Sequence, residues 1–259
     1  MLHVYWEEVN MVYLDPVDEY IGLADWIKPL INEDITPKNL VRRLNRYLNK
    51  YHPSRVKLYK SARGNLEKSD FSIGAEYDPE LDQAKKKQFI INFIINHEKT
   101  NFWTMTGERA DRFVLEMTET LVHEYQHQHQ YRSRRYKTHK NLYKSDHTDP
   151  AVKDEQEYFG DPDEIDAYSA NIAARIFLVN YKLNKNQRTQ PVEESDSIDL
   201  QSYYRVFGKE HPVVDQLIAK IKENIIYLKD LDNGKIRTKR TARPNLSKRD
   251  ELRGWFRSR

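Results

Sequence analysis

The chain of 259 residues contains no cysteine. Disulfide bonds are therefore excluded, and so is every metal site whose ligands are thiolates. A metal ion could be held only by histidine, aspartate and glutamate, with weaker oxygen ligands beside them. The absence of cysteine also fits a protein of a reducing compartment most simply.

Long hydrophobic runs are also missing. The longest apolar-rich stretch, "FIINFIIN" at Phe89 to Asn96, is far too short to cross a bilayer. The first residues, "MLHVYWEEVNMVYLDP", contain early acidic residues and no apolar segment of the kind that a secretory signal needs. We therefore expect a soluble, cytoplasmic protein without a membrane partner.

Two common enzyme signatures are absent. The eight glycines are scattered and form no phosphate-binding loop, and no G-x-S-x-G nucleophile motif is present. The chain does contain 32% charged, 38% hydrophobic and 12% aromatic residues, enough to build a core under a highly polar surface. This composition argues against wholesale disorder and for one large domain or two small ones.

The net charge of +3 is unevenly distributed. Residues 235–259 alone carry +8, so the remaining chain carries −5. A basic tail, assigned to 233–259, on an acidic body suggests a polyanionic partner such as nucleic acid. The candidate contact residues are Lys235, Arg237, Lys239, Arg240 and Arg243. The alternative is a tail that is solvated or docks on the acidic body.

The order of predicted elements indicates an α+β fold. Residues 1–55 are expected to form a helical segment, with helices that start at the capping residues Asp15 and Thr36 and stop near His52. "VKLYKS", "FSIGAEYD" and "KQFIINFIINHE" then predict an antiparallel sheet of at least three strands between about Val56 and Trp103.

Helices return after the sheet. One is predicted from about 108 to 134 and another from a cap at Asp161 to about Leu183. Two more cover "IDLQSYYRVFG" and "HPVVDQLIAKIKENIIYLKDL". We assign residues 56–232, with the sheet and these helices, to one domain.

One short stretch carries chemistry. His123, Glu124 and His127 in "LVHEYQHQHQ" fit the pattern H-E-x-x-H. Residues four apart lie one turn above each other on one helical face, so both imidazoles can bind one metal ion. The glutamate beside the first histidine can take a proton from a water that the metal activates.

A catalytic zinc needs a third protein ligand. "GDPDEIDAYSANIA" supplies acidic residues at the start of the helix that follows, 34 to 39 residues after His127. Glu164 is the preferred ligand because the alanines that follow it make this helix slim where it would meet the first one. Asp163 and Asp166 are the alternatives, and Asp166 could instead orient an imidazole.

H-E-x-x-H on one helix with E-x-x-A on the next resembles the gluzincin branch of the zincin metallopeptidases, including the small ImmA/IrrE-type family. "DPDEIDAYSANIA" is also similar to small predicted metallopeptidases of tailed bacteriophages, which makes a virion-associated location the alternative to a cytoplasmic one. The likeness covers about residues 71–183.

The resemblance implies a zincin-like fold, with a small antiparallel or mixed sheet packed on an active-site helix. It also implies a Zn²⁺ ion held by His123, His127 and Glu164, with Glu124 as general base. An edge strand, expected at "KQFIINFIIN", would pair with an extended substrate. The group that stabilises the oxyanion is open: Tyr168 is the candidate, with Tyr158 and Arg175 as alternatives.

The remaining histidines and cations have other interpretations. His129 should point away from the metal as a surface residue, since it lies about 200° around the helix from His127. A second metal site could use His97, His139 and His147. "YRSRRYKTHKNLYK", at 131–144, could bind single-stranded nucleic acid, although such a composition is more typical of a solvated helix end. Gln130 and Ser133 exclude the metzincin pattern.

We therefore expect a zinc metallopeptidase that hydrolyses a peptide bond in a peptide or protein substrate with a zinc-activated water. The alternative is a catalytically silent protein on a zincin scaffold, structural and associated with a virion or with nucleic acid through its basic tail.

Overall fold

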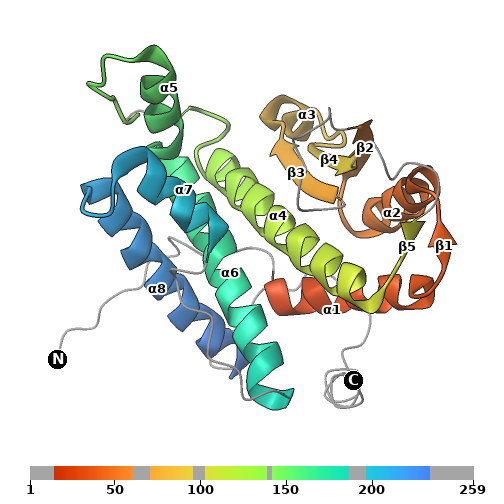
Figure 1. Cartoon of the computed structure of the whole chain (residues 1–259). Coiled ribbons are helices and arrows are strands. Elements are labelled where there is room, and N and C mark those ends of the chain that lie inside the picture. Colours follow the sequence, from red (N-terminus) through yellow and green to blue (C-terminus); the bar gives the residue numbers. More distant parts are fainter. Residues whose placement is uncertain (1–14, 61–70, 96–102, 139–141, 187–196, 234–259) are drawn as a thin grey trace.

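The computed structural model describes residues 15–60, 71–95, 103–138, 142–186 and 197–233. Figure 1 shows helix α4 (Gly107–Ser133) in the middle of the molecule, with a small sheet on one side and the long helices α6 (Pro162–Asn186) and α8 (Pro212–Asp232) on the other. The fold is therefore α+β. Within the described residues no helix combines the length and the apolar character that a membrane span requires.

The predicted helices form close to the predicted limits. Helix α1 (Pro16–Ile27) begins after Asp15, whose carboxylate accepts a hydrogen bond from the backbone N–H of Val17 at 2.9 Å. A 3-10 turn, η1 (Lys28–Leu30), follows it. Helix α2 (Pro37–Tyr51) begins after Thr36 and ends at His52, as predicted. Helix α7 (Ile198–Phe207) lies before α8.

The sheet corrects two expectations. Its strands are β2 (Ser54–Lys60), β3 (Phe71–Tyr77) and β4 (Phe89–Ile95), in the order β2-β4-β3. Strand β4 pairs antiparallel with β3 but parallel with β2, so the sheet is mixed rather than antiparallel. Strand β4 is also central and not the predicted edge strand. The buried residues of β4 alternate along one face, a pattern that does not distinguish a central strand from an edge strand.

Four short elements escaped prediction. Strands β1 (Asp34–Ile35) and β5 (Trp103–Thr104) pair with each other, and α3 (Pro79–Gln83) connects β3 to β4. Helix α5 (Pro150–Phe159) follows Asp149, which caps it through its side chain. The Asp–Pro signal for α5 was visible in the sequence. The helix buries no residue fully, however, so it has no strong hydrophobic periodicity to read.

One hydrophobic cluster joins the layers. It extends from Val17 in α1, through Phe93 in the sheet and Leu121 in α4, to Leu228 in α8. Helix α4 is buried on several sides because it contacts α1, β3 and α6. Such a helix is held rigidly, and side chains that project from it have defined positions.

A buried carboxylate links the sheet to the end of α4. Asp82 in α3 accepts hydrogen bonds from the Tyr77 hydroxyl at 2.7 Å and the Tyr136 hydroxyl at 3.0 Å. Arg132 donates two more, at 2.7 and 2.6 Å. Burial alone would raise the pKa of Asp82, but these hydrogen bonds and the charge of Arg132 lower it below its usual value.

We predict that Asp82→Asn destabilises the protein by about 2 kcal/mol at pH 7, because it leaves Arg132 without its charged partner. The pKa of Asp82 is lowered in the folded state, so its contribution is present above about pH 4 and is lost as the pH falls further. Urea unfolding at pH 7 and pH 3 measures this. Asp154→Asn, at an exposed position of α5, is the matched control. Equal stability of the two variants at pH 7 would contradict the prediction.

Candidate metal centre

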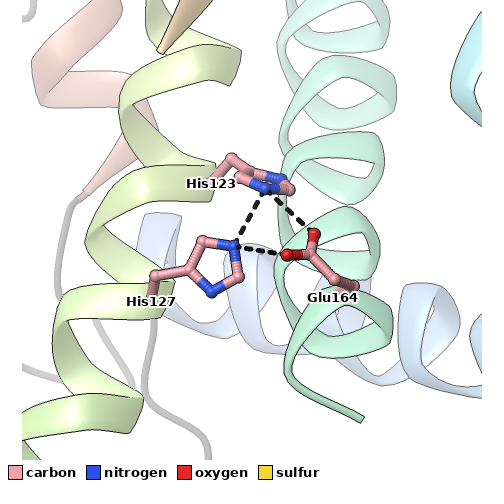
Figure 2. A group of neighbouring side chains, drawn as sticks. All are labelled: His123, His127 and Glu164. Atoms are coloured by element: carbon pink, nitrogen blue, oxygen red, sulfur yellow. Dashed lines mark hydrogen bonds and ion pairs between the residues drawn. The ribbon is translucent and has the colours of Figure 1, made fainter. Parts of the chain in front are cut away.

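Helix α4 places His123 and His127 on one face, one turn apart. Their rings are 4.8 Å apart between centroids, and the two Nε2 atoms are 3.1 Å apart (Figure 2). Two nitrogen lone pairs thus point to the same place from a rigid, buried helix. This is the arrangement that the H-E-x-x-H spacing predicts.

Helix α6 brings a carboxylate to the same point. Glu164 Oε2 lies 3.5 Å from His123 Nε2, and Glu164 Oε1 lies 3.4 Å from His127 Nε2 (Figure 2). Ala167, one turn after Glu164, is fully buried, and its small side chain allows α6 to approach α4 closely. Ala173 is also fully buried but lies about 180° around the helix from Glu164, on the side that contacts α8, so it does not contribute to this approach, contrary to the expectation from the sequence. Glu164 is therefore the acidic residue that joins the histidines, as predicted from the sequence.

The dimensions of this group fit a divalent metal. Ligand atoms at about 2.0–2.1 Å from a tetrahedral zinc ion are separated from one another by about 3.4 Å. The two Nε2 atoms are 3.1 Å apart, and each faces a different Glu164 oxygen, at 3.5 Å for His123 and 3.4 Å for His127. With one donor atom taken from each residue, the three atoms lie within 4.8 Å of one another, so small shifts would bring them to these separations. In addition, Glu164 Oε2 is buried and faces His123 Nε2 at a distance longer than an ordinary hydrogen bond. Three protein ligands are available, as in catalytic zinc sites, and a fourth position would remain for water or substrate.

The charges in the metal-free site are complementary. Burial alone would raise the pKa of Glu164, but hydrogen bonds and charge from both histidines lower it to about 2. Burial alone would lower the pKa of His127, but the Glu164 carboxylate raises it to about 9. At neutral pH a proton on His127 therefore balances the Glu164 charge, and a metal cation must displace that proton.

Gln130 orients one of the imidazoles. His127 Nδ1 lies 3.0 Å from Gln130 Oε1, which can only accept a hydrogen bond, so Nδ1 carries the proton and Nε2 is free for a metal. Gln130 in turn donates to the backbone oxygen of Asp163 at 2.9 Å. This role was not predicted from the sequence. Its only signal there is that Gln130 lies three residues after His127, on the same helical face.

The two alternative acidic ligands are used elsewhere. Asp163 receives two hydrogen bonds from Arg134, at 2.6 and 2.5 Å. Asp166 pairs with Lys220 of α8. Among the described residues, neither belongs to the group of potential ligands, and the expected second role of Asp166, to orient an imidazole, falls to Gln130 instead. The two ion pairs fix the start of α6 against the end of α4 and against α8.

Glu124 is buried beside the two histidines, with 5% of its surface exposed. Burial raises its pKa, while the charges of His123 and His127 lower it and that of Glu164 raises it further. A hydrogen bond from the backbone of Tyr77 also lowers the pKa. Glu124 thus lies between the ligand group and strand β3, with a proton affinity above that of an ordinary glutamate.

Two tyrosines lie close to Glu164. The ring of Tyr168 packs edge-on against that of His123, with centroids 4.7 Å apart, and the Tyr158 hydroxyl lies 3.5 Å from the Tyr168 hydroxyl. Burial and the negative charge of Glu164 both raise the pKa of Tyr158. Both hydroxyls are therefore protonated donors at neutral pH. Tyr158 is 48% exposed, so it is the one that is open to a substrate.

Arg175 is too far from the ligands to act on an oxyanion. It lies eleven residues after Glu164 on α6, about 16 Å along the helix axis. Its guanidinium donates two hydrogen bonds of 3.0 Å to Glu119. Tyr168 and Tyr158 therefore remain as the candidates for the residue that would stabilise an oxyanion.

Of the other candidate histidines, those that the structure describes lie outside this group. His129 does not join it, although it is half-buried rather than on the surface as expected, and burial lowers its pKa. His147 accepts a hydrogen bond from the backbone of Asp149 at 3.1 Å. His97, His139 and the basic tail, including Lys235, Arg237, Lys239, Arg240 and Arg243, lie outside the described residues.

A series of contacting polar side chains, which was not predicted from the sequence, connects the N-terminal helices to α4. His52 is 3% exposed, and its Nδ1 lies 2.7 Å from the hydroxyl of Tyr125, inside the H-E-x-x-H motif. On its other side, His52 Nε2 lies 3.2 Å from Glu19 Oε2 of α1. These polar contacts fix α4 from the side opposite to α6. The local sequence pattern around His52 does not predict that this polar side chain is buried.

Comparisons with known proteins add no assignment. No family model matches the chain, and neither the curated proteins nor the solved structures contain a match. The function is therefore inferred from the geometry of His123, Glu124, His127 and Glu164.

Proposed function

We propose that this protein is a zinc-dependent metallopeptidase that uses His123, His127 and Glu164 as ligands and Glu124 as general base. The observation that supports this most strongly is the convergence of His123, His127 and Glu164, whose donor atoms lie within 4.8 Å of one another, next to a buried carboxylate that is not one of them. A site that only stabilised the fold would need a fourth protein ligand and no base.

When bound, zinc would supply a Lewis acid that activates a water and polarises the carbonyl under attack. Glu124 then accepts the proton of the attacking water and passes it to the leaving amine. Its raised pKa suits this task, because a base must hold the proton long enough to deliver it. Tyr158 or Tyr168 donates a hydrogen bond to the oxyanion.

Strand β3 offers a place for an extended peptide. It is an edge strand, since β4 is its only neighbour in the described part of the sheet. Asp78 donates its N–H to Gln88 next to β4, so Tyr77, Ala75 and Ile73 direct their backbone groups to the free edge.

The two ends of that edge are already in use. Arg112 donates to the backbone oxygen of Phe71 at 2.5 Å, and the backbone of Tyr77 bonds to Glu124. Between them, Ile73 and Ala75 are available for β-strand pairing with a substrate beside the metal ligands. Strand β3 thus replaces β4 as the proposed substrate-binding strand.

We expect one zinc ion per chain, measured by metal analysis after incubation with zinc and gel filtration. His123→Ala and Glu164→Gln should each weaken zinc binding by more than about 100-fold. Gln130→Leu, which removes only the support of His127, should cost about 10- to 100-fold. His129→Ala is the control and should bind as the unchanged protein does. Unaltered zinc content in His123→Ala would overturn the assignment.

Glu124→Gln should retain zinc but lose hydrolysis by about 100- to 10,000-fold, because it removes the base and keeps the ligands. Cleavage of a proteome-derived peptide library, followed by mass spectrometry of new termini, measures this. Glu116→Gln, two turns earlier on α4, is the matched control. If the zinc-loaded protein cleaves no library peptide, the catalytically silent alternative is favoured.

Zinc binding should release about one proton at pH 7, because His127 is protonated below about pH 9 and must be neutral to bind metal. Zinc affinity should therefore rise with pH by about tenfold per unit and level off above about pH 9. Calorimetry in two buffers with different ionisation enthalpies counts the protons. An affinity that is independent of pH between 7 and 8 would contradict the site charge described above.

A further inference from the structure

We propose that the outer surface of α2 and β2 binds the phosphate backbone of double-stranded nucleic acid. This surface is made of other residues than those of the basic tail and does not depend on the metal centre. We define the basic face as the exposed or half-exposed cations of these two elements other than Arg43, which pairs with Glu33; they are Lys38, Arg42, Arg46, Lys50, Arg55 and Lys57.

The charge of this region is one-sided. The chain has 40 acidic residues, so a stretch of 32 residues would contain about five, yet residues 35–66 contain none and carry +9. The tail at 235–259 carries +8 and the whole chain +3, so everything outside these two segments carries −14. The basic face is therefore a strong local exception on an acidic body, and its field favours a polyanion.

The cations on α2 form a row. Lys38, Arg42, Arg46 and Lys50 are spaced four residues apart, and all four are exposed. They extend about 18 Å along one side of a rigid helix. Leu40, Leu44 and Leu48 anchor the opposite side in the core with no exposed surface. The row is thus a continuous line of positive charge that is presented in a fixed direction.

These cations are not neutralised by neighbours. Several exposed or half-buried arginines elsewhere in the described chain pair with acids, as Arg134 does with Asp163 and Arg205 with Glu155. On α2, as far as the described residues extend, only Arg43 does so, with Glu33 at 3.2 Å. Lys38, Arg42 and Arg46 have no ion pair within the same part of the chain. Their charge is open to an external partner.

Strand β2 extends the face beyond the helix. Asn45 of α2 accepts a hydrogen bond from the backbone N–H of Val56 at 3.3 Å, so α2 lies along the free edge of β2. Arg55, Lys57 and Tyr59 alternate with the buried Val56 and point to the outer side of the sheet. Figure 1 shows α2 and β2 together at the end of the molecule away from α8.

The composition of the face favours phosphates over other anionic partners. Among the described large hydrophobic residues that are exposed, none lies on α2, and Tyr59 is the one that lies on β2. A protein partner would need apolar anchors between the charges, and a membrane-surface helix would need an apolar side to insert. A duplex needs only regularly spaced cations, because its phosphates form a uniform line of charge.

The test uses the full chain and a fluorescently labelled 20-base-pair duplex, with anisotropy measured between 50 and 200 mM salt. Substitution of Arg42, Arg46 and Lys50 by Gln should weaken binding at least about tenfold at low salt. It should also change the slope of the logarithm of the association constant against the logarithm of the salt concentration. The slope should become less negative by about 3, because each of the three substitutions leaves one phosphate without its cation. The matched control replaces Lys209, Lys222 and Lys229 by Gln, which removes the same charge from the α7–α8 side. It should leave binding unchanged.

Several outcomes would overturn the proposal. Absence of duplex binding at 50 mM salt would do so, and so would equal weakening by the control, which would indicate only a general charge effect. Binding carried entirely by residues 235–259, shown by a truncated chain, would assign the duplex to the tail. If the triple substitution abolished binding to phosphatidylserine vesicles but not to the duplex, the face would be assigned to a membrane. If it changed the oligomeric state but not duplex binding, the face would be assigned to a second copy of the chain.

Discussion

The candidate centre depends on the close packing of α4 against α6. Ala167, one turn after Glu164, is fully buried, and its small side chain suits a close approach that lets Glu164 reach both histidines. Ala173 is about 180° around the helix from Glu164, on the side that bears Asp166 and contacts α8. A larger side chain at Ala167 is therefore expected to move Glu164 away from the histidines, and a zinc ion bound as proposed would lose its third ligand.

The acidic residues at the start of α6 are chemically alike, but they differ in the residues with which they interact. Asp163 is held by Arg134 and Asp166 by Lys220, whereas Glu164 interacts with the two histidines and with Tyr158. The ion pairs position the helix, and the residue left between them is the proposed ligand, whose pKa is unusually low. The carboxylate of Glu164 and the protonated His127 thus hold the metal-free site together until a cation replaces the proton.

The order of strands separates two proposed activities. Strand β3 borders α4 and the ligand group, whereas β2 borders α2 and the basic face, and β4 lies between them. The two features therefore lie at opposite edges of one small sheet. A nucleic acid on α2 would leave the β3 edge open, so a peptidase held on a duplex could still reach a protein substrate beside it.

By itself the sequence determined the longer helices, the α+β order and the shared helical face of His123 and His127, because these follow from local spacing on a single element. It also favoured Glu164, through the alanines that follow it. Only the tertiary structure decided what depends on distant partners: the central place of β4, the hydrogen bond of Gln130 to His127, the pairing of His52 with Tyr125, and the lack of acidic partners for the described cations of α2. Strand order, burial and ion pairing arise from contacts between segments that are remote in the sequence, so local periodicity does not predict them.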